Sequence, residues 1–306
     1  MVGPGFDGAA GQGEGEGVQS GWILRPDPKA PGLTRAVTGR DHDGAEVEIA
    51  VVEERPLTLY LNGQEIVTAM TLGDHPEALA VGYLANQGML LPSDEITAVD
   101  FDAEAEAVVV RTARETDYED RLKRVTRTSG CAVGTLFGDV MAGLEGLILP
   151  AGEVRASDLY ALAKTINTTP SLYLEAGAIH GTVLCEGARP LVYMEDVGRH
   201  NAVDKIAGWM RLRGAAPAGK LLYTTGRLTS EMVIKCALMG IAALASRSGF
   251  TASGVDLARQ VDLTLIGRLR GRRFVCLSGE HRLIRDADPT GVAEEAAKHR
   301  RKGARR

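Results

Sequence analysis

The sequence predicts an α/β protein in which a layered α/β domain follows a smaller, β-rich N-terminal region. Two observations lead to this prediction. From about residue 155 onward, short apolar runs typical of buried strands alternate with runs whose apolar residues have helical spacing. Before that point, short strand patterns separated by turn residues predominate. With 306 residues, of which 44% are hydrophobic, the chain is long enough to bury a large core.

The N-terminal region is expected to begin with short strands. Residues 47–53 and 57–61 have the composition of strands, and Asn62 and Gly63 form the dipeptide that favours a tight hairpin turn. A further pair of strands is expected within residues 93–125, where many acidic side chains indicate a solvated surface. These patterns predict a small β-rich unit.

One helix is expected within the same region. Asp74 can cap its first turn, Pro76 suits the first helical position, and apolar residues recur with helical spacing at 78–84. Gly88 then marks the end of the helix. We expect these strands, this helix and the cysteine segment described below to make up residues 22–150.

The layered α/β domain is expected to span residues 151–285. Its strands are predicted at 172–174, 181–185, 191–194, 221–224, 241–245 and 263–266. Residues 201–211 have helical spacing, with Asn201 as the expected cap, and a second helix is predicted after Gly226. Alternation of this kind is typical of helices that cover a mixed or parallel sheet.

Both ends of the chain are expected to be tails. Residues 1–21 are rich in glycine and nearly free of apolar side chains, so they cannot bury enough surface to offset the entropy of ordering. Residues 286–306 end in a basic run without periodicity, which is typical of a solvated tail. The net charge of −5 argues against a general binder of nucleic acids or membrane surfaces. Because no apolar stretch approaches the roughly 20 residues of a membrane span and no secretion signal is evident, we expect a cytoplasmic protein.

Cys131 is the candidate catalytic residue. The chain has no Cys-x-x-Cys pair, so neither a disulfide framework nor a cysteine zinc site is expected. Small residues flank Cys131 on both sides and leave it accessible, and Arg127 adds a positive charge that favours the thiolate, the form that attacks sulfur. A small cysteine buried in a tight turn fits the same segment. The remaining cysteines lie in apolar runs typical of inert core thiols: Cys185, Cys236 and Cys276.

Polar residues gather at 195–205, where a strand is followed by a helix. Such junctions are where open α/β sheets place their ligands. Arg199 and His200 have no evident local structural role and can bind an anion or carry a proton, although charged loop residues are mostly solvated surface. His180 begins an apolar strand, where a core histidine is the simpler interpretation and a catalytic base is the alternative.

Two further segments have the composition of phosphate sites. Residues 224–231 join a strand to a helix through a glycine turn, and free amide groups together with Arg227 suit a phosphate, although Thr229 as a simple helix cap explains part of the pattern. Residues 268–273 hold four arginines, which pair with phosphate in a planar, bidentate way. They predict a loop that seats a nucleotide or pyrophosphate, with a solvated basic hairpin as the alternative. The predicted cofactor-binding residues are Arg268, Leu269, Arg270, Gly271, Arg272 and Arg273.

Taken in order, these segments resemble the formate dehydrogenase accessory sulfurtransferase family, FdhD. The similarity runs from about residue 53 to residue 282, and several long motifs in the same order are far more specific than any one of them. The motifs are Arg55-Pro56-Leu57 with Leu61-Asn62-Gly63, Thr128-Ser129-Gly130-Cys131, Glu195-Asp196-Val197-Gly198-Arg199-His200-Asn201-Ala202, Gly226-Arg227 with Glu231-Met232-Val233, and Leu265-Ile266-Gly267.

The resemblance implies a sulfurtransferase that takes sulfur from a cysteine desulfurase as a persulfide on Cys131. The sulfur would pass to a molybdenum or tungsten cofactor, the bis-molybdopterin guanine dinucleotide, before that cofactor enters the formate dehydrogenase apoenzyme. By the same resemblance, residues 268–273 contact the guanine nucleotide part of this substrate, and the larger domain has a cytidine deaminase-like fold. A homodimer is implied as well. Neither a resident metal nor a permanent cofactor is expected.

One residue departs from the pattern of some family members, which carry Cys-x-x-Cys where this chain has Gly134 in the fourth position. A single persulfide site suffices chemically, because its outer sulfur can pass directly to a metal or to a reducing thiol. Two other interpretations remain. A zinc deaminase would need His-x-Glu together with Pro-Cys-x-x-Cys, a set that the chain does not complete. A chaperone that binds the cofactor while Cys131 only packs is also compatible with the sequence.

Overall fold

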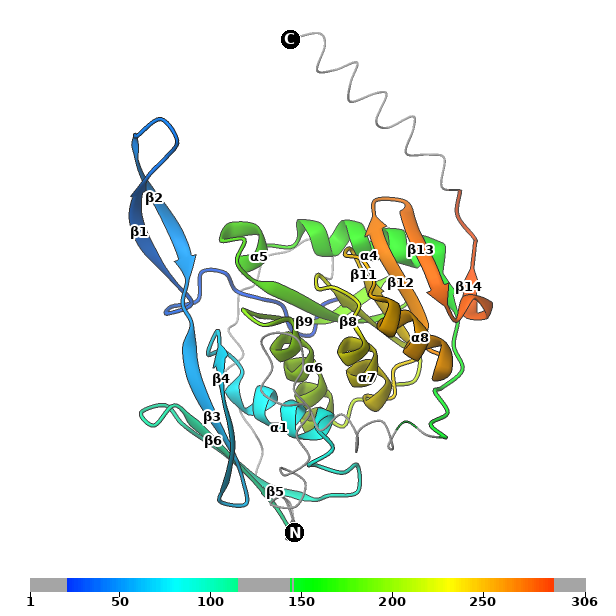
Figure 1. Cartoon of the computed structure of the whole chain (residues 1–306), viewed down its shortest axis with the longest axis horizontal. Helices are drawn as coiled ribbons and strands as arrows, with labels where there is room; N and C mark the ends of the chain where they lie inside the picture. Colours follow the sequence, from blue (N-terminus) through cyan, green and yellow to red (C-terminus); the bar gives the residue numbers. More distant parts are fainter. Residues whose placement is uncertain (1–20, 115–143, 145, 289–306) are drawn as a thin grey trace.

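The computed structural model describes residues 21–114, 144 and 146–288, and its largest element is a six-stranded mixed sheet (Figure 1). The strands are β8 (His180–Glu186), β9 (Arg189–Asp196), β10 (Lys220–Thr224), β11 (Ala243–Ser246), β12 (Thr264–Arg270) and β13 (Arg273–Ser278). Their order across the sheet is β13-β12-β11-β10-β8-β9. β10, β11 and β12 are parallel to one another, whereas the other three pair antiparallel with their neighbours.

Helices cover both faces of this sheet, which confirms the predicted α/β class. They are α4 (Ala156–Thr168), α5 (Leu172–Glu175), α6 (Arg199–Arg213), α7 (Ser230–Leu238) and α8 (Ala252–Gln260). α4 packs on the face that carries Tyr223, and α6 and α7 pack on the face that carries Leu222, because neighbouring residues of a strand point to opposite faces. The cytidine deaminase-like layering stays a prediction. No helix of the described residues is long and apolar enough to cross a membrane.

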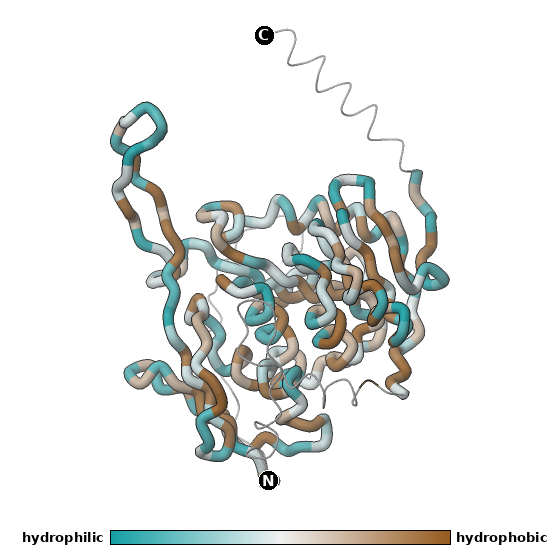
Figure 2. The backbone as a smooth tube through the Cα atoms, viewed as in Figure 1, coloured by the Kyte–Doolittle hydropathy of each residue, from teal (hydrophilic) through white to brown (hydrophobic). Residues whose placement is uncertain are grey.

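The N-terminal region forms a second sheet and a ribbon. The four strands of the sheet are β3 (Arg55–Leu61), β4 (Gln64–Thr71), β5 (Ile96–Asp102) and β6 (Ala107–Thr112), in the order β4-β3-β6-β5. Asn62 and Gly63 form the predicted turn, with φ values of 49° and 87°. The ribbon of β1 (Thr34–Arg40) and β2 (Glu46–Val52) projects from the body and has a hydrophilic tip in Figure 2. A short β7 (Val154–Arg155) pairs with β14 (Leu283–Ile284).

The helix α1 (Pro76–Asn86) joins the two parts by packing tightly on α6. A Cβ atom on Gly82 would overlap the backbone carbonyl of Asp204, and one on Gly208 would overlap the carbonyl of Ala78. The two helix backbones therefore touch, as only glycine allows. One hydrophobic core extends from β3 through this contact to β12. The predicted division at residues 150 and 151 stays a prediction.

Replacing Gly82 by Ala is expected to lower the free energy of unfolding by about 1–3 kcal/mol or more, because a backbone carbonyl cannot rotate away from the added methyl group as a side chain can. Urea unfolding followed by circular dichroism measures this loss. Gly39→Ala is the matched control, since nothing lies within 4 Å of a Cβ atom there. Equal unfolding midpoints for the two variants would contradict the close helix contact.

The predicted strand at residues 172–174 is wrong, because this segment forms the helix α5. The carboxylate of Glu195 accepts hydrogen bonds from the backbone amides of Leu172 and Tyr173, at 2.8 and 2.9 Å. These two bonds satisfy free amides of a first helical turn, as a capping side chain would. A residue distant in sequence therefore decides the conformation of an apolar run that alone resembles a strand.

The caps predicted for α1 and α6 are also wrong. His75, in a left-handed conformation with φ 50°, is the N-cap of α1, and Gly198 is the N-cap of α6. Asp74 instead forms an ion pair with Lys205 at 2.5 Å. Asn201 donates hydrogen bonds from its side-chain amide to a backbone carbonyl of β4 and to a carboxylate of β9. Local patterns assign these polar side chains to helix caps, but in the folded protein each binds a partner that is distant in sequence.

Candidate functional site

One edge of the six-stranded sheet gathers three of the segments that the sequence singles out. The carboxyl ends of the parallel strands β10, β11 and β12 lie there. The start of β8 and the end of β9 lie there too, because His180 pairs with Asp196, and Thr182 pairs with Thr224 at the end of β10. We call this the carboxyl edge: His180, Arg199, residues 225–227, residues 247–248 and residues 268–273. Ligands of open α/β sheets bind at such edges.

Hydrogen bonds tie neighbouring turns of the carboxyl edge together. Gly181 donates its backbone N–H to the hydroxyl of Thr225 at 3.0 Å, and Thr225 donates its N–H to the carbonyl of Gly181 at 2.9 Å. The hydroxyl of Ser246 donates to the carbonyl of Gly226 at 2.6 Å. The turn after β10 is therefore fixed from both sides, which holds the following residue, Arg227, at the surface.

Two helix N-termini begin at the carboxyl edge without a side-chain cap. Gly198, which has no side chain, is the N-cap of α6, and Thr229 is the N-cap of α7, where its hydroxyl accepts no hydrogen bond from the helix. Free amides and the helix dipole make such a terminus attractive to an anion. The side chain of Arg199 lies across Gly226, with its Cβ and Cδ 3.1 Å from where a Cβ atom would stand on that glycine. The absence of a side chain at Gly226 thus lets a cation cover the turn that precedes α7.

The two predicted histidines take different places. His180 is half-buried at the carboxyl edge, with Nδ1 3.4 Å from the hydroxyl of Thr225. Burial lowers its pKa, and the positive charges of Arg199 and Arg227 lower the pKa further. His200 is buried, and its Nε2 lies 3.0 Å from Oε2 of Glu231 on α7. His200 therefore links α6 to α7, whereas His180 faces the cations of the edge.

The arginine segment, predicted as a loop between two strands, is the hairpin that joins β12 to β13, and most of its residues belong to the strands themselves. Residues 268–270 end β12, and Arg273 begins β13. Arg268 has a φ of 55° at a shift in the pairing register, and its N–H donates to the carbonyl of Ser248 at 2.7 Å. Leu269 is buried in the core. The four arginines are exposed, and none pairs with an acidic group of the described residues: Arg268, Arg270, Arg272 and Arg273.

A buried charge cluster behind the edge was not predicted. Lys205 is fully buried and forms ion pairs with Asp74 at 2.5 Å and Asp196 at 2.6 Å. The hydroxyl of Thr71 donates to Asp196 at 2.5 Å. Glu195 is buried as well, and burial raises its pKa to about 7. The polar run at 195–205 therefore has two roles, since these inward groups fix the junction while Arg199 faces the edge.

Cys131 lies outside the described residues, so its role stays a prediction. The predicted tails also lie outside them, apart from residue 21 and residues 286–288. Of the described cysteines, Cys185 and Cys236 are buried and Cys276 is half-buried. Burial raises the pKa of all three thiols. Each keeps its proton at neutral pH and is a poor nucleophile.

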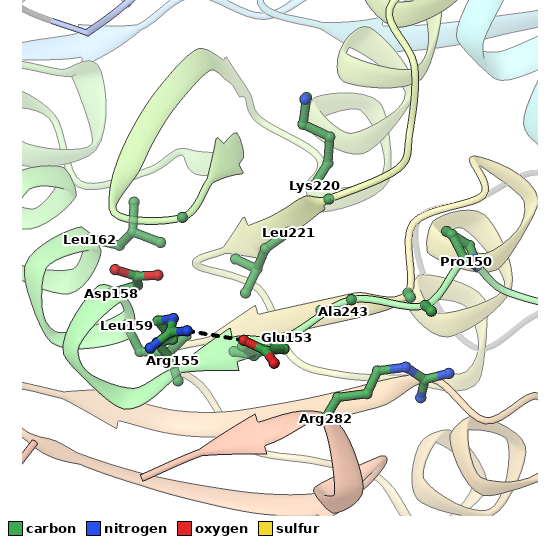
Figure 3. A pocket seen from close by; sticks show the side chains of 16 residues that line it. Pro150, Glu153, Arg155, Asp158, Leu159, Leu162, Lys220, Leu221, Ala243 and Arg282 are labelled. Atoms are coloured by element: carbon green, nitrogen blue, oxygen red, sulfur yellow. Dashed lines mark hydrogen bonds and ion pairs between the residues drawn. The ribbon is translucent and has the colours of Figure 1, made fainter. Parts of the chain in front are cut away.

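A cavity at the opposite edge of the sheet is a weaker candidate (Figure 3). It lies between α4 and the first residues of β10 and β11, and its volume of about 40 Å³ admits only a few water molecules. Its cations are already paired, because Arg155 binds Glu153 at 3.1 Å, Lys220 binds Glu186 at 2.5 Å and Arg282 binds Asp262 at 2.8 Å. The cavity is therefore less suited to an anionic ligand than the carboxyl edge, where the arginines of the hairpin have no acidic partner among the described residues.

Comparison with known proteins supplies the family. Residues 52–284 match the model of the FdhD/NarQ family. The chain belongs to this family. It is 32% identical to the sulfur carrier protein FdhD of Bacillus subtilis over 237 residues, which are 75% of this chain and 88% of that protein. It is 31% identical to the FdhD of Bacillus pumilus over 229 residues, or 73% of this chain and 86% of the relative.

A solved structure is similar as well. The crystal structure of a protein described as a candidate formate dehydrogenase accessory protein, from Desulfotalea psychrophila, matches with a TM-score of 0.67 and 26% identity. The match covers 82% of this chain and 99% of that one. The FdhD/NarQ match includes Cys131 and every segment of the carboxyl edge.

Proposed function

We propose that this FdhD/NarQ protein is a sulfur carrier that takes up sulfur as a persulfide on Cys131 and delivers it to a molybdenum or tungsten cofactor. The cofactor is the substrate, the bis-molybdopterin guanine dinucleotide, and its guanine nucleotide binds at the carboxyl edge. The relatives named sulfur carrier protein support the sulfur step. The observation that carries the binding step is the gathering of cations and two uncapped helix N-termini at one edge of the sheet.

The sulfur step needs only one thiolate. The Cys131 thiolate attacks the outer sulfur of a persulfide on a cysteine desulfurase, a new sulfur–sulfur bond forms at Cys131, and the desulfurase leaves as a thiolate. The outer sulfur later departs to the metal, or to a reducing thiol, and Cys131 becomes a thiolate again. Delivery as sulfide consumes two electrons, which the metal supplies, or which two reducing thiols supply as they join in a disulfide. A glycine at residue 134 is compatible with this path, since no second cysteine takes part.

The binding step fits an extended anion better than a single phosphate. From β8, which carries His180, to β12, which carries Arg268, there are three strand spacings, or about 14 Å. Arg199 and Arg227 lie near one end of this span and the arginine hairpin lies at the other. A nucleotide with a pyrophosphate can reach along it. We further propose a homodimer, in which two such edges serve the two guanine ends, and the formate dehydrogenase apoenzyme as the receiving partner.

Replacing Arg227 or Arg270 by Ala is expected to weaken GDP binding about tenfold each, because a charge-assisted hydrogen bond to phosphate contributes about 1.5 kcal/mol or more. Isothermal titration calorimetry at one fixed salt concentration measures the change, since exposed charges are screened by salt. Arg35→Ala, an exposed arginine of β1, is the matched control and should bind GDP as the wild type does. Unchanged affinity in both edge variants would move the nucleotide site elsewhere.

A further inference from the structure

His180 is a group in the carboxyl edge whose charge can change near neutral pH. It is half-buried at the start of β8 and has Nδ1 3.4 Å from the hydroxyl of Thr225. Arg199 and His200 of α6 and Arg227 of the turn before α7 all act on it electrostatically, and each disfavours the charged ring. The sheet thus holds a titratable ring within a cluster of positive groups.

Acidic groups near this ring are engaged with other partners. Asp196, which pairs with His180 across the two strands, turns its carboxylate to Lys205 and to the amide of Asn201. Glu231 of α7 lies 3.0 Å from His200. In the absence of a ligand, burial and the surrounding cations therefore hold the pKa of His180 below its usual range, and the ring is neutral at neutral pH.

An anion bound at the carboxyl edge favours the charged form of the His180 ring instead of the neutral form. A phosphate attracted by Arg199 and Arg227 places negative charge close to the ring, and an opposite charge within about 4–6 Å favours the charged form of a histidine. When Nδ1 donates its proton to the hydroxyl of Thr225, Nε2 is the nitrogen that receives a proton and donates a hydrogen bond to the phosphate. The charged ring then adds one more cation to the site.

We propose that His180 takes up one proton from solvent when a guanine nucleotide binds at the carboxyl edge, so that the nucleotide binds more tightly as the pH falls. This inference rests on the proposed function, because it requires the nucleotide phosphate to lie among the cations of that edge. His180 is then a residue that couples the charge of the site to the charge of its ligand.

Thermodynamic linkage between proton binding and nucleotide binding gives the direction of the pH dependence. If the bound protein holds more protons than the free protein, a lower pH favours the complex and a higher pH favours release. One linked proton changes the dissociation constant by at most about tenfold per pH unit, between the pKa values of the ring in the free and bound states. Calorimetry measures the number of protons taken up per nucleotide, because each proton adds the ionisation heat of the buffer to the heat of binding.

GDP titrations of the wild type, His180→Gln and His281→Gln at pH 6, 7 and 8 test the proposal. The nucleotide's own titration is common to all three proteins, so the difference between them reports the histidine. From pH 6 to pH 8 we expect the dissociation constant of the wild type to rise at least about threefold more than that of His180→Gln. His281, in the short 3-10 helix η1 (Glu280–Arg282) beyond the end of β13, lies at the opposite edge, and its variant should keep the wild-type slope.

Titrations in two buffers of different ionisation heat count the protons directly. The wild type should take up more protons than His180→Gln, with a difference of up to one per GDP. If His180→Gln fails to fold, the proton uptake of the wild type in excess of that expected from the known titration of GDP decides the matter. Tight GDP binding with equal slopes and no excess proton uptake overturns this inference and leaves the nucleotide site standing. Absence of GDP binding to the wild type overturns the site itself.

Discussion

Cells that depend on a Cys131→Ala variant of this protein are expected to lose formate dehydrogenase activity almost completely. The reason is chemical, because a persulfide needs a thiol that is ionised near neutral pH. The thiols of Cys185, Cys236 and Cys276 have pKa values raised by burial and cannot take its place. The assay is formate oxidation in a strain that lacks its own sulfur carrier and carries the gene of each variant.

Cys276→Ala is the matched control for this experiment, since it removes a thiol of β13 that is only half-buried. It should retain activity close to that of the wild type. Full activity of Cys131→Ala would reject sulfur transfer through this residue. The protein would then be a chaperone that binds the cofactor at the carboxyl edge without chemistry.

Replacing Lys205 by Met is expected to lower the free energy of unfolding by about 3–5 kcal/mol, because two carboxylates would lose their buried partner. The ammonium group contacts Asp74 at 2.5 Å and Asp196 at 2.6 Å, and it also donates to the backbone carbonyl of Glu195 at 2.9 Å. It therefore joins the start of α1, the end of β9 and the helix α6. Urea unfolding at pH 7 gives the loss.

Lys220→Met is the control for this change. Lys220 also forms a close ion pair, with Glu186 at 2.5 Å, but the carboxylate is 43% exposed and water screens the pair. Its loss should cost about 1 kcal/mol or less. Similar losses in the two variants would show that burial of Lys205 does not matter to the fold, contrary to this account.

Local sequence patterns predict the elements whose conformation depends mainly on residues close by in the sequence. The Asn62–Gly63 turn and the strands beside it follow from the preference of these two residues for positive φ. Helical spacing likewise predicts most of α6 and α7. The segment 172–174 fails because the carboxylate of Glu195, which folding brings there, fixes a helical turn. The sequence also left α4, α8 and β1 without a specific prediction.

The candidate site is predictable in its parts but not in its assembly. Arginine-rich and polar segments indicate anion binding one at a time, whereas the parallel pairing of β10, β11 and β12 brings them to one edge. Lys205 could not be recognised, because in the sequence it is an ordinary lysine of a segment with helical spacing. Its burial depends on Asp74, which is 131 residues away along the chain.

Intact mass measurement of the protein after incubation with a cysteine desulfurase and cysteine is the most direct test of sulfur transfer through Cys131. We expect a gain of one sulfur atom that a reductant removes, that persists in Cys276→Ala and that is absent from Cys131→Ala. No gain in the wild type, or an equal gain in Cys131→Ala, would contradict the assignment of Cys131 as the sulfur carrier.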